Sequence, residues 1–274
     1  MKKKRRYIFI IIILIIIYAA LLFLEHKYQD NGKDPVIQVP ESTLKVSVKA
    51  KEKTLLKGVK AIDEEDGDIS SQVYIESISP FQSDQTRTIT YAVLDSDDNM
   101  TRATRKLKYK DYKKPTITLT QALCMNYIES TNSLKDYVSA KSSVDGNISS
   151  KISVDKTDYS GDDYYVTYSV TDSCGVKTSL KAKVSILSNP SDIKISLSDY
   201  LIRVKKGKEI NPRKYIDTIE VMGVEDDSLR YNVKITNNYD ASKEGTYEFI
   251  YRLENNGETG ITKLVVIVEG DENE

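Results

Sequence analysis

The chain has 274 residues, which is enough for two or three domains besides a short terminal segment. It carries 40 Lys and Arg against 41 Asp and Glu, so it lacks the basic excess with which proteins neutralise nucleic-acid phosphates. Its single histidine, His26, leaves no basis for Ser-His-Asp or Cys-His catalysis or for zinc sites of clustered His and Cys. A two-carboxylate glycosidase remains compatible with the composition. We expect a protein that is not an enzyme and does not bind nucleic acid.

The first predicted element is a membrane-spanning helix over residues 7–24. This segment has no charged side chain, and five consecutive cations at residues 2–6 come directly before it. Eighteen helical residues rise about 27 Å, close to the thickness of a bilayer's hydrocarbon core. The alternative is a cleaved signal peptide, but the apolar run continues to Leu24 past the small residues that a cleavage site would need. We expect a signal anchor with a cytoplasmic N-terminus and the rest of the chain outside the cell.

The remainder of the chain contains an internal repeat of about eighty residues. The pattern V-x-A-x4-D-G-[DN]-I-S-S occurs at residues 59–71 and again at residues 138–150, an offset of 79. Downstream, residues 90–96 and 167–173 share the pattern T-Y-x-V-x-D-S at an offset of 77. Two linked matches at nearly the same offset indicate duplicated structural units.

A third copy is fainter. Residues 245–254 have the same alternation and place Tyr251 opposite Tyr91 and Tyr168. Upstream, residues 226–229 take the place of the D-G-[DN]-I element without its glycine. We therefore expect an altered turn at that point.

Each copy is predicted to consist of short strands. Residues 88–94 and 164–170 alternate β-branched or aromatic side chains with other types, and Asp-Gly, Asn-Gly and Ser-Gly pairs mark turns between strands. Pro115 and residues 189–190 mark the boundaries between copies. Regular short strands in units of this size are typical of antiparallel sandwiches, so the sequence predicts an all-β fold.

These motifs resemble the bacterial Ig-like domain that occurs in tandem on Gram-positive surface proteins and in some pesticidal crystal proteins. Residues 61–69, A-I-D-E-E-D-G-D-I, match the family's A-x-D-x-x-D-G-D-I element, and residues 91–95 match its Y-x-V-x-D strand. The second copy keeps residues 145–148 and 172–175, whereas the third retains mainly residues 245–247 and the strand after them. The resemblance implies three tandem Ig-like antiparallel β-sandwiches following one N-terminal transmembrane helix.

The predicted organisation therefore has seven segments. They are a cytoplasmic stub 1–6, a transmembrane signal anchor 7–24, a juxtamembrane linker 25–34, Ig-like domains 35–112, 113–188 and 189–270, and an acidic tail 271–274.

Acidic turns in the first copy suggest a metal site. In an Ig-type sandwich the loops that carry these residues share one end, which would bring together Asp63, Asp66, Asp68, Asp95 and Asp97. Hard oxygen ligands of this kind fit Ca²⁺, which accepts six to eight oxygens in flexible geometry. The alternative is that these side chains bond their own backbone in Asx turns, with Gly67 supplying the positive φ.

The two cysteines, Cys124 and Cys174, both fall in the second copy. Outside the cell, an even pair within one domain is typical of a disulfide. In an Ig-type sandwich Cys124 would lie on an early edge strand and Cys174 on the turn before the last strand, and those strands run side by side. We expect a disulfide, with two reduced thiols as the alternative.

The first hypothesis for function is a membrane-anchored bacterial cell-surface protein whose Ig-like modules act in binding, adhesion or spacing. The alternative is an envelope-assembly accessory that docks a membrane enzyme or polysaccharide machinery. The expected partners are the membrane and an unknown protein or carbohydrate ligand, with no cofactor other than the Ca²⁺ considered above. Candidate recognition residues in the loops of the third copy are Asn237, Asn238, Tyr239, Asp240, Asn255, Asn256 and Gly257. The alternative there is a terminal repeat degraded by drift.

Overall fold

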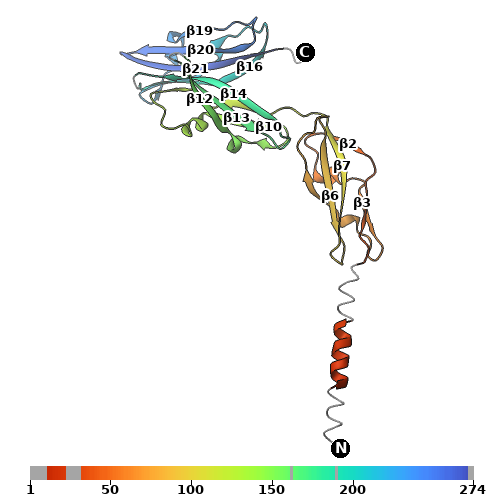
Figure 1. The fold of residues 1–274 in the computed structure, drawn as a ribbon. Coiled ribbons are helices and arrows are strands. Elements are labelled where there is room, and N and C mark those ends of the chain that lie inside the picture. Colours follow the sequence, from red (N-terminus) through yellow and green to blue (C-terminus); the bar gives the residue numbers. More distant parts are fainter. Residues whose placement is uncertain (1–10, 23–31, 161–162, 189–190, 271–274) are drawn as a thin grey trace, which may run out of the picture. The chain divides into compact units, whose positions relative to one another are not determined.

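The computed structural model describes residues 11–22, 32–160, 163–188 and 191–270 (Figure 1). Its contacts divide the chain into two compact units, Met1–Asp111 and Tyr112–Glu274, which we call unit 1 and unit 2. Several predicted segments lie wholly or mostly outside the described residues, namely the stub 1–6, the linker 25–34, the boundary 189–190 and the tail 271–274. His26 lies outside them too.

The N-terminal helix corrects the prediction of a membrane anchor. Residues 11–22 are helical. Within the described part of the chain, no helix has both the length and the apolar character that crossing a bilayer requires. The prediction of a single-pass cell-membrane protein with a transmembrane segment over residues 7–24 is therefore wrong. That prediction counted residues 7–10 and 23–24, which lie outside the described residues.

Unit 1 contains two sheets around one core. The three-stranded sheet has the order β1 (Val36–Gln38), β3 (Lys60–Asp63), β4 (Gly67–Asp68). The four-stranded sheet has the order β2 (Thr43–Val46), β7 (Met100–Tyr109), β6 (Arg87–Leu94), β5 (Tyr74–Ile78). A short helix, α2 (Glu52–Leu55), and a 3₁₀ turn, η1 (Ser70–Gln72), connect strands of the two sheets. We call these two sheets sheet pair 1.

Unit 2 contains the same arrangement twice. Sheet pair 2 has a three-stranded sheet of β11 (Gly146–Asn147), β10 (Val138–Ser142) and β8 (Thr116–Leu119) and a four-stranded sheet of β12 (Ser153–Ser160), β13 (Asp163–Thr171), β14 (Lys177–Ile186) and β9 (Cys124–Met125). Sheet pair 3 has a three-stranded sheet of β15 (Ile193–Leu197), β17 (Ile216–Val221) and β18 (Val224–Glu225) and a four-stranded sheet of β16 (Leu201–Lys205), β21 (Glu258–Glu269), β20 (Gly245–Asn255) and β19 (Lys234–Asn237). Four 3₁₀ turns accompany these strands: η2 (Ser133–Tyr137), η3 (Ser149–Lys151), η4 (Pro212–Tyr215) and η5 (Asp227–Asn232).

The predicted β-rich, sandwich-like fold is confirmed, but the sheets are not purely antiparallel. In each four-stranded sheet an early strand pairs in parallel with the last strand: β2 with β7, β9 with β14, and β16 with β21. A parallel neighbour needs a long crossover connection, and here most of each sheet pair lies between the two strands. The division into three domains remains a prediction, because the contacts group sheet pairs 2 and 3 into one unit.

One fully buried tyrosine occupies the same strand position in each sheet pair. These residues are Tyr91, Tyr168 and Tyr251, each 0% exposed. Each hydroxyl donates a hydrogen bond of 2.8 Å to a backbone carbonyl in an upstream helical turn, at Leu55, Leu134 and Pro212 respectively. A buried hydroxyl needs such a partner, so the same hydrogen bond holds a turn against each core.

The turn that replaces the D-G-[DN] element in sheet pair 3 is altered, as expected, but it retains a glycine. β17 and β18 are joined by Met222 and Gly223, with φ angles of 53° and 77°. Two successive positive φ angles are typical of the two-residue turns that join hairpin strands. The glycine has therefore moved to the hairpin tip instead of being lost.

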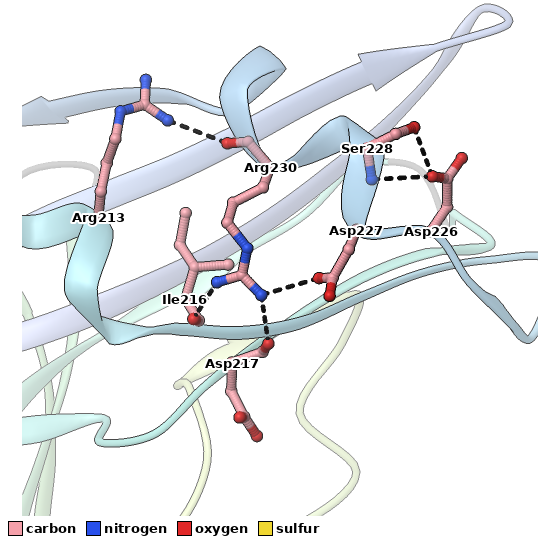
Figure 2. Close-up of polar contacts among 7 residues, drawn as sticks. All are labelled: Arg213, Ile216, Asp217, Asp226, Asp227, Ser228 and Arg230. Carbon is pink, nitrogen blue, oxygen red and sulfur yellow. Dashed lines mark hydrogen bonds and ion pairs between the residues drawn. The ribbon is translucent and has the colours of Figure 1, made fainter.

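The segment after this hairpin is fixed by an aspartate cap and by Arg230 (Figure 2). Asp226 Oδ1 accepts a hydrogen bond from the Ser228 N–H at 3.0 Å, just as Asp68 Oδ1 accepts from the Ser70 N–H at 2.9 Å in sheet pair 1. The Arg230 guanidinium donates to the carbonyl of Asp217 at 2.7 Å and to the carboxylate of Asp227 at 2.8 Å. The capped turn is thus conserved in geometry although its sequence has changed.

Candidate functional site

The predicted acidic residues of unit 1 act as acceptors in turns. Asp63 is 6% exposed, and its Oδ1 accepts hydrogen bonds from the N–H groups of Glu65 and Asp66, both at 2.8 Å. These bonds lower the pKa of the Asp63 carboxyl, the bond from Asp66 most strongly. Asp68 caps η1, and bonds from the hydroxyl and N–H of Ser70 lower its pKa.

The two acidic turns do meet, as the resemblance implied. Asp66 Oδ2 accepts from the Ser96 N–H, and its Oδ1 accepts from the Ser96 hydroxyl, both at 2.8 Å. Asp95 Oδ1 accepts from the N–H groups of Asp97 at 2.9 Å and Asn99 at 2.8 Å. Within the described residues, no group of three or more His, Cys, Asp or Glu has the arrangement of a metal site. Asp63, Asp68 and Asp95 bond their own turns as in the Asx-turn alternative, whereas Asp66 bonds to Ser96 of the other turn. The Ca²⁺ site stays a prediction.

The predicted disulfide between Cys124 and Cys174 is not formed. Cys124 pairs with Ser185 near the end of β14, whereas Cys174 lies in the turn before Lys177, where β14 begins. Eight residues of strand separate Lys177 from Ser185, which corresponds to about 26 Å. The prediction placed the two strands side by side correctly but missed that the thiols lie at opposite ends. Burial raises the pKa of the Cys124 thiol, as expected for an inert structural cysteine.

The polar loops of the third copy do not form one surface. Asn237 ends β19 opposite Phe249 of β20, and residues 238–240 follow it, whereas Asn255 to Gly257 lie at the hairpin that ends β20. The Tyr239 ring packs against Tyr247 and Phe249 at centroid distances of 5.6 and 5.5 Å. Asn238 and Gly257 border two different cavities.

The cavity beside Asn238 lies between sheet pairs 2 and 3, and we call it the junction pocket. Its volume is about 260 Å³, and it is lined by Asp163, Tyr165, Lys181, Lys183, Asn238, Thr246, Glu248 and Val265. The first four residues come from β13 and β14, and the others come from β20, β21 and the loop after β19. Neither sheet pair alone would form it.

A buried lysine lies between the two sheet pairs. Lys263 on β21 is 1% exposed, and its Nζ donates to the carbonyl of Lys183 at 2.6 Å, the hydroxyl of Ser185 at 3.1 Å and the Oε1 of Glu248 at 2.7 Å. All three ammonium protons therefore have acceptors, which a buried charge requires. Because the first two acceptors lie on β14, the contact joins the two sheet pairs.

Apolar and arginine contacts extend this junction. Leu201 and Val265 of sheet pair 3 belong to the same buried cluster as the core of sheet pair 2. Arg203 donates to the carbonyl of Ile117 at 3.2 Å. β14, β16 and β21 accordingly lie together in Figure 1. The two sheet pairs therefore form one continuous body with a fixed pocket between them.

A second cavity near the junction is larger but less suited to recognition. It has a volume of about 390 Å³ and is lined by Ile186, Leu187, Ser188, Arg252, Gly257, Glu258, Thr259 and Ile261. Arg252 pairs with Glu254 at 2.8 Å, and Glu258 accepts from the N–H of Asp192 at 3.0 Å. It contains no aromatic side chain, whereas the junction pocket combines an aromatic ring with several polar groups.

The junction pocket was not predicted from the sequence, although the sequence contains one signal for the junction. Leu264, Val265 and Val266 are consecutive and all buried, so both faces of β21 are covered. An apolar run without alternation indicates a strand buried on both faces, and Lys263 lies next to that run.

No protein-family model matches the chain, and no curated protein matches it. Among solved structures, it is similar to the M60 catalytic domain with the CBM51-1 and CBM51-2 domains of ZmpB from Clostridium perfringens, at 12% identity and a TM-score of 0.25, over 87% of this chain and 31% of that chain. It is similar to human CDH23 EC21-23 at 10% identity and a TM-score of 0.23, over 86% of this chain and 100% of that chain. It is similar to the lipoprotein BT2262 from Bacteroides thetaiotaomicron at 13% identity and a TM-score of 0.21, over 84% of this chain and 98% of that chain.

The chain thus spans less than a third of the ZmpB chain. At these TM-scores the similarities carry no argument about function.

Proposed function

We propose that this chain is a non-catalytic binding protein of the cell surface, in which unit 2 is the recognition part. The observation that carries the proposal is the fixed junction between sheet pairs 2 and 3. Lys263 and the shared apolar cluster hold eight side chains of a concave pocket in place before any ligand arrives. A preformed concave pocket with few, well-placed polar groups is the usual form of a ligand site.

The residue chemistry supports binding in preference to catalysis. The pocket's carboxylates, Asp163 and Glu248, lie in ion pairs with Lys183 at 2.5 Å and with Lys263 at 2.7 Å. A general acid or base must be able to exchange a proton with a substrate, whereas one oxygen of each of these carboxylates is already occupied by a neighbouring ammonium group. Unit 1 would then act as a spacer or a second contact surface.

The experiment is a binding screen with the purified full chain. The chain is applied to arrays of bacterial wall polysaccharides and glycans, and in parallel to immobilised surface proteins. Saturable binding that persists at physiological salt is expected for at least one ligand class. Turnover of a polysaccharide without stable binding would overturn the proposal. Selective retention of a membrane enzyme or polysaccharide machinery would favour the envelope-assembly alternative.

A further inference from the structure

We propose that the junction pocket binds a single sugar-acid unit, with the sugar carboxylate held by Lys181 and Lys183 and the hydroxyl groups held by Asp163, Glu248, Asn238 and Thr246. This inference rests on the proposed function and assigns it a site and a ligand class. The pocket volume of about 260 Å³ fits one monosaccharide unit, since pockets for drug-sized ligands begin at roughly 300 Å³.

The charges at the pocket favour an anionic ligand. Asp163 neutralises Lys183, and Glu248 neutralises Lys263. Among the described residues, no carboxylate lies within ion-pair distance of Lys181, whose Nζ lies over the Tyr165 ring at 4.7 Å from its centroid. The ring holds this ammonium at the pocket wall through a cation–π contact. One positive charge therefore remains for a ligand carboxylate.

Lys183 adds a second donor for the same carboxylate. The hydrogen bond to Asp163 raises the pKa of Lys183, so this ammonium stays protonated at neutral pH. An ammonium has three donor protons, and the ion pair with Asp163 uses one of them. Lys181 and Lys183 lie two residues apart on β14 and both line the pocket, so a single anionic group can bridge them.

The remaining polar groups favour a ligand rich in hydroxyl groups over a bare anion. The ion pairs use Oδ1 of Asp163 and Oε1 of Glu248, and an ionised carboxylate accepts at both oxygens. Carboxylates repel an anion but accept hydrogen bonds from hydroxyl groups. The Asn238 carbonyl oxygen accepts from the Glu248 N–H at 2.8 Å, which leaves its amide N–H₂ as a donor. A molecule with one carboxylate and several hydroxyl groups satisfies both sets.

Apolar surface at the pocket completes the match to a sugar ring. Tyr165, which is partly exposed, supplies this surface, whereas Val265 on the opposite wall is 1% exposed. The carbon face of a pyranose is apolar, and aromatic or aliphatic surface beside polar donors is suited to it.

The test measures binding of D-glucuronate, D-glucose and inorganic phosphate to the full chain by isothermal titration and ligand-observed NMR. We expect saturable glucuronate binding, and at least about tenfold weaker binding of glucose and of phosphate. The variant Lys181→Gln should weaken glucuronate binding by at least about tenfold. Lys181 is exposed, so this change leaves the core intact, and a thermal melt verifies it.

Lys177→Gln is the matched control. Lys177 lies on the same strand, pairs with Asp155 at 2.8 Å outside the pocket, and its loss changes the net charge equally. The Lys177→Gln variant should bind glucuronate as the natural chain does. Absent glucuronate binding, equal binding by Lys181→Gln, or phosphate binding as tight as glucuronate would each overturn the inference. If the full chain binds wall polysaccharide while Lys181→Gln has no effect, the pocket assignment fails and the proposed function stands.

Discussion

The hydroxyl of Tyr251 donates a hydrogen bond to the carbonyl oxygen of Pro212, 2.8 Å away and 39 residues earlier in the chain. This bond joins the core strand β20 to the turn η4, and its counterparts in the other two sheet pairs have the same length. Burial raises the pKa of Tyr251, so the hydroxyl keeps its proton at all physiological pH values. The faint third copy therefore retains the internal bond of the clear copies.

Replacing Tyr251 with Phe should lower the free energy of unfolding by about 1–2 kcal/mol, because the Pro212 carbonyl loses its hydroxyl donor. Tyr168→Phe should cost a similar amount, since its hydroxyl makes the same bond to Leu134. Urea unfolding followed by circular dichroism measures both. Tyr231→Phe is the control, because Tyr231 is 83% exposed and its loss should change little. Equal effects of all three substitutions would contradict the assignment.

Replacing Lys263 with Met should uncouple sheet pairs 2 and 3. The change leaves Glu248, 15% exposed in its side chain, without its cation and costs about 3–5 kcal/mol. We expect unit 2 of the natural chain to unfold in one calorimetric transition, and this transition to split or broaden in Lys263→Met. The double variant Lys263→Met/Glu248→Gln should recover part of the loss, because no unpaired charge then remains. A single sharp transition in Lys263→Met would contradict the role given to this lysine.

Arg105 is an exception within the core of unit 1. It is 4% exposed, its Nε and Nη1 have no hydrogen-bond partner, and its Nη2 lies 3.5 Å from Glu41. The register places it opposite Ile89, the position at which the other sheet pairs have Ala182 and Leu264. The buried donors are therefore a local cost that the equivalent positions avoid.

We expect Arg105→Leu to raise the free energy of unfolding by about 1–3 kcal/mol, because an apolar side chain replaces unsatisfied donors. Thermal and urea unfolding measure the change. Arg102→Leu on the exposed face of the same strand is the control; it removes only the surface pair with Glu76 and should change stability by less than about 1 kcal/mol. Destabilisation by Arg105→Leu would show that the guanidinium has a partner in solution.

Both cysteines should be detected as thiols. Without reductant, iodoacetamide should add two groups to the unfolded chain and react slowly with the folded chain at pH 8. Burial raises the folded-state pKa of Cys124, so its contribution to stability is present below the unfolded thiol pKa and is lost as pH rises through the folded value. Mass spectrometry counts the adducts. If the unfolded chain gains no adducts without reductant, the two cysteines form a disulfide and this prediction is wrong.

The Asx turn at Asp63 should give a pH-dependent stability. Its folded-state pKa is lowered by the N–H of Asp66, so the carboxylate contributes above its ordinary pKa and loses this contribution as pH falls through the folded value. Asp63→Ala should therefore reduce Tm at pH 7, and the Tm of the variant should approach that of the natural chain at low pH. Asp63→Asn keeps an acceptor and should reduce Tm less. A Tm difference independent of pH would contradict this account.

The sequence predicted the local features of the fold because they depend on short spacings. The turn at Gly67, the alternation around Tyr91 and the equivalence of Tyr251 all follow from residues close in the chain, and the structure places them as expected. The sequence did not indicate that the third turn shifts to Gly223, because residues 226–229 resemble the whole D-G-[DN]-I element, whereas only its capping aspartate is equivalent.

Features that depend on contacts between distant elements were not predictable in this way. The disulfide prediction required the register of β9 on β14, and neighbouring strands alone do not give the register. Predicting the junction pocket would require knowing that β14 covers Lys263. The sequence does not show this, because Lys181 occupies the same register position in sheet pair 2 and is exposed. One outward-facing lysine is buried and the other is not, because only one of these faces docks against a neighbouring sheet.

The parallel pairing of early and last strands determines how the chain would respond to mechanical load. In each sheet pair a first strand (β1, β8 or β15) precedes the strand that pairs in parallel with the last one, so a pulling force between the ends would reach the parallel ladder once that first strand has detached. The ladder would then be sheared as a whole instead of opening bond by bond. The registered pairs number four between β2 and β7, two between β9 and β14, and five between β16 and β21. Sheet pair 2 therefore has the shortest parallel ladder. The contact of Lys263 with β14 adds hydrogen bonds beside this ladder, which would otherwise be the first to separate under tension.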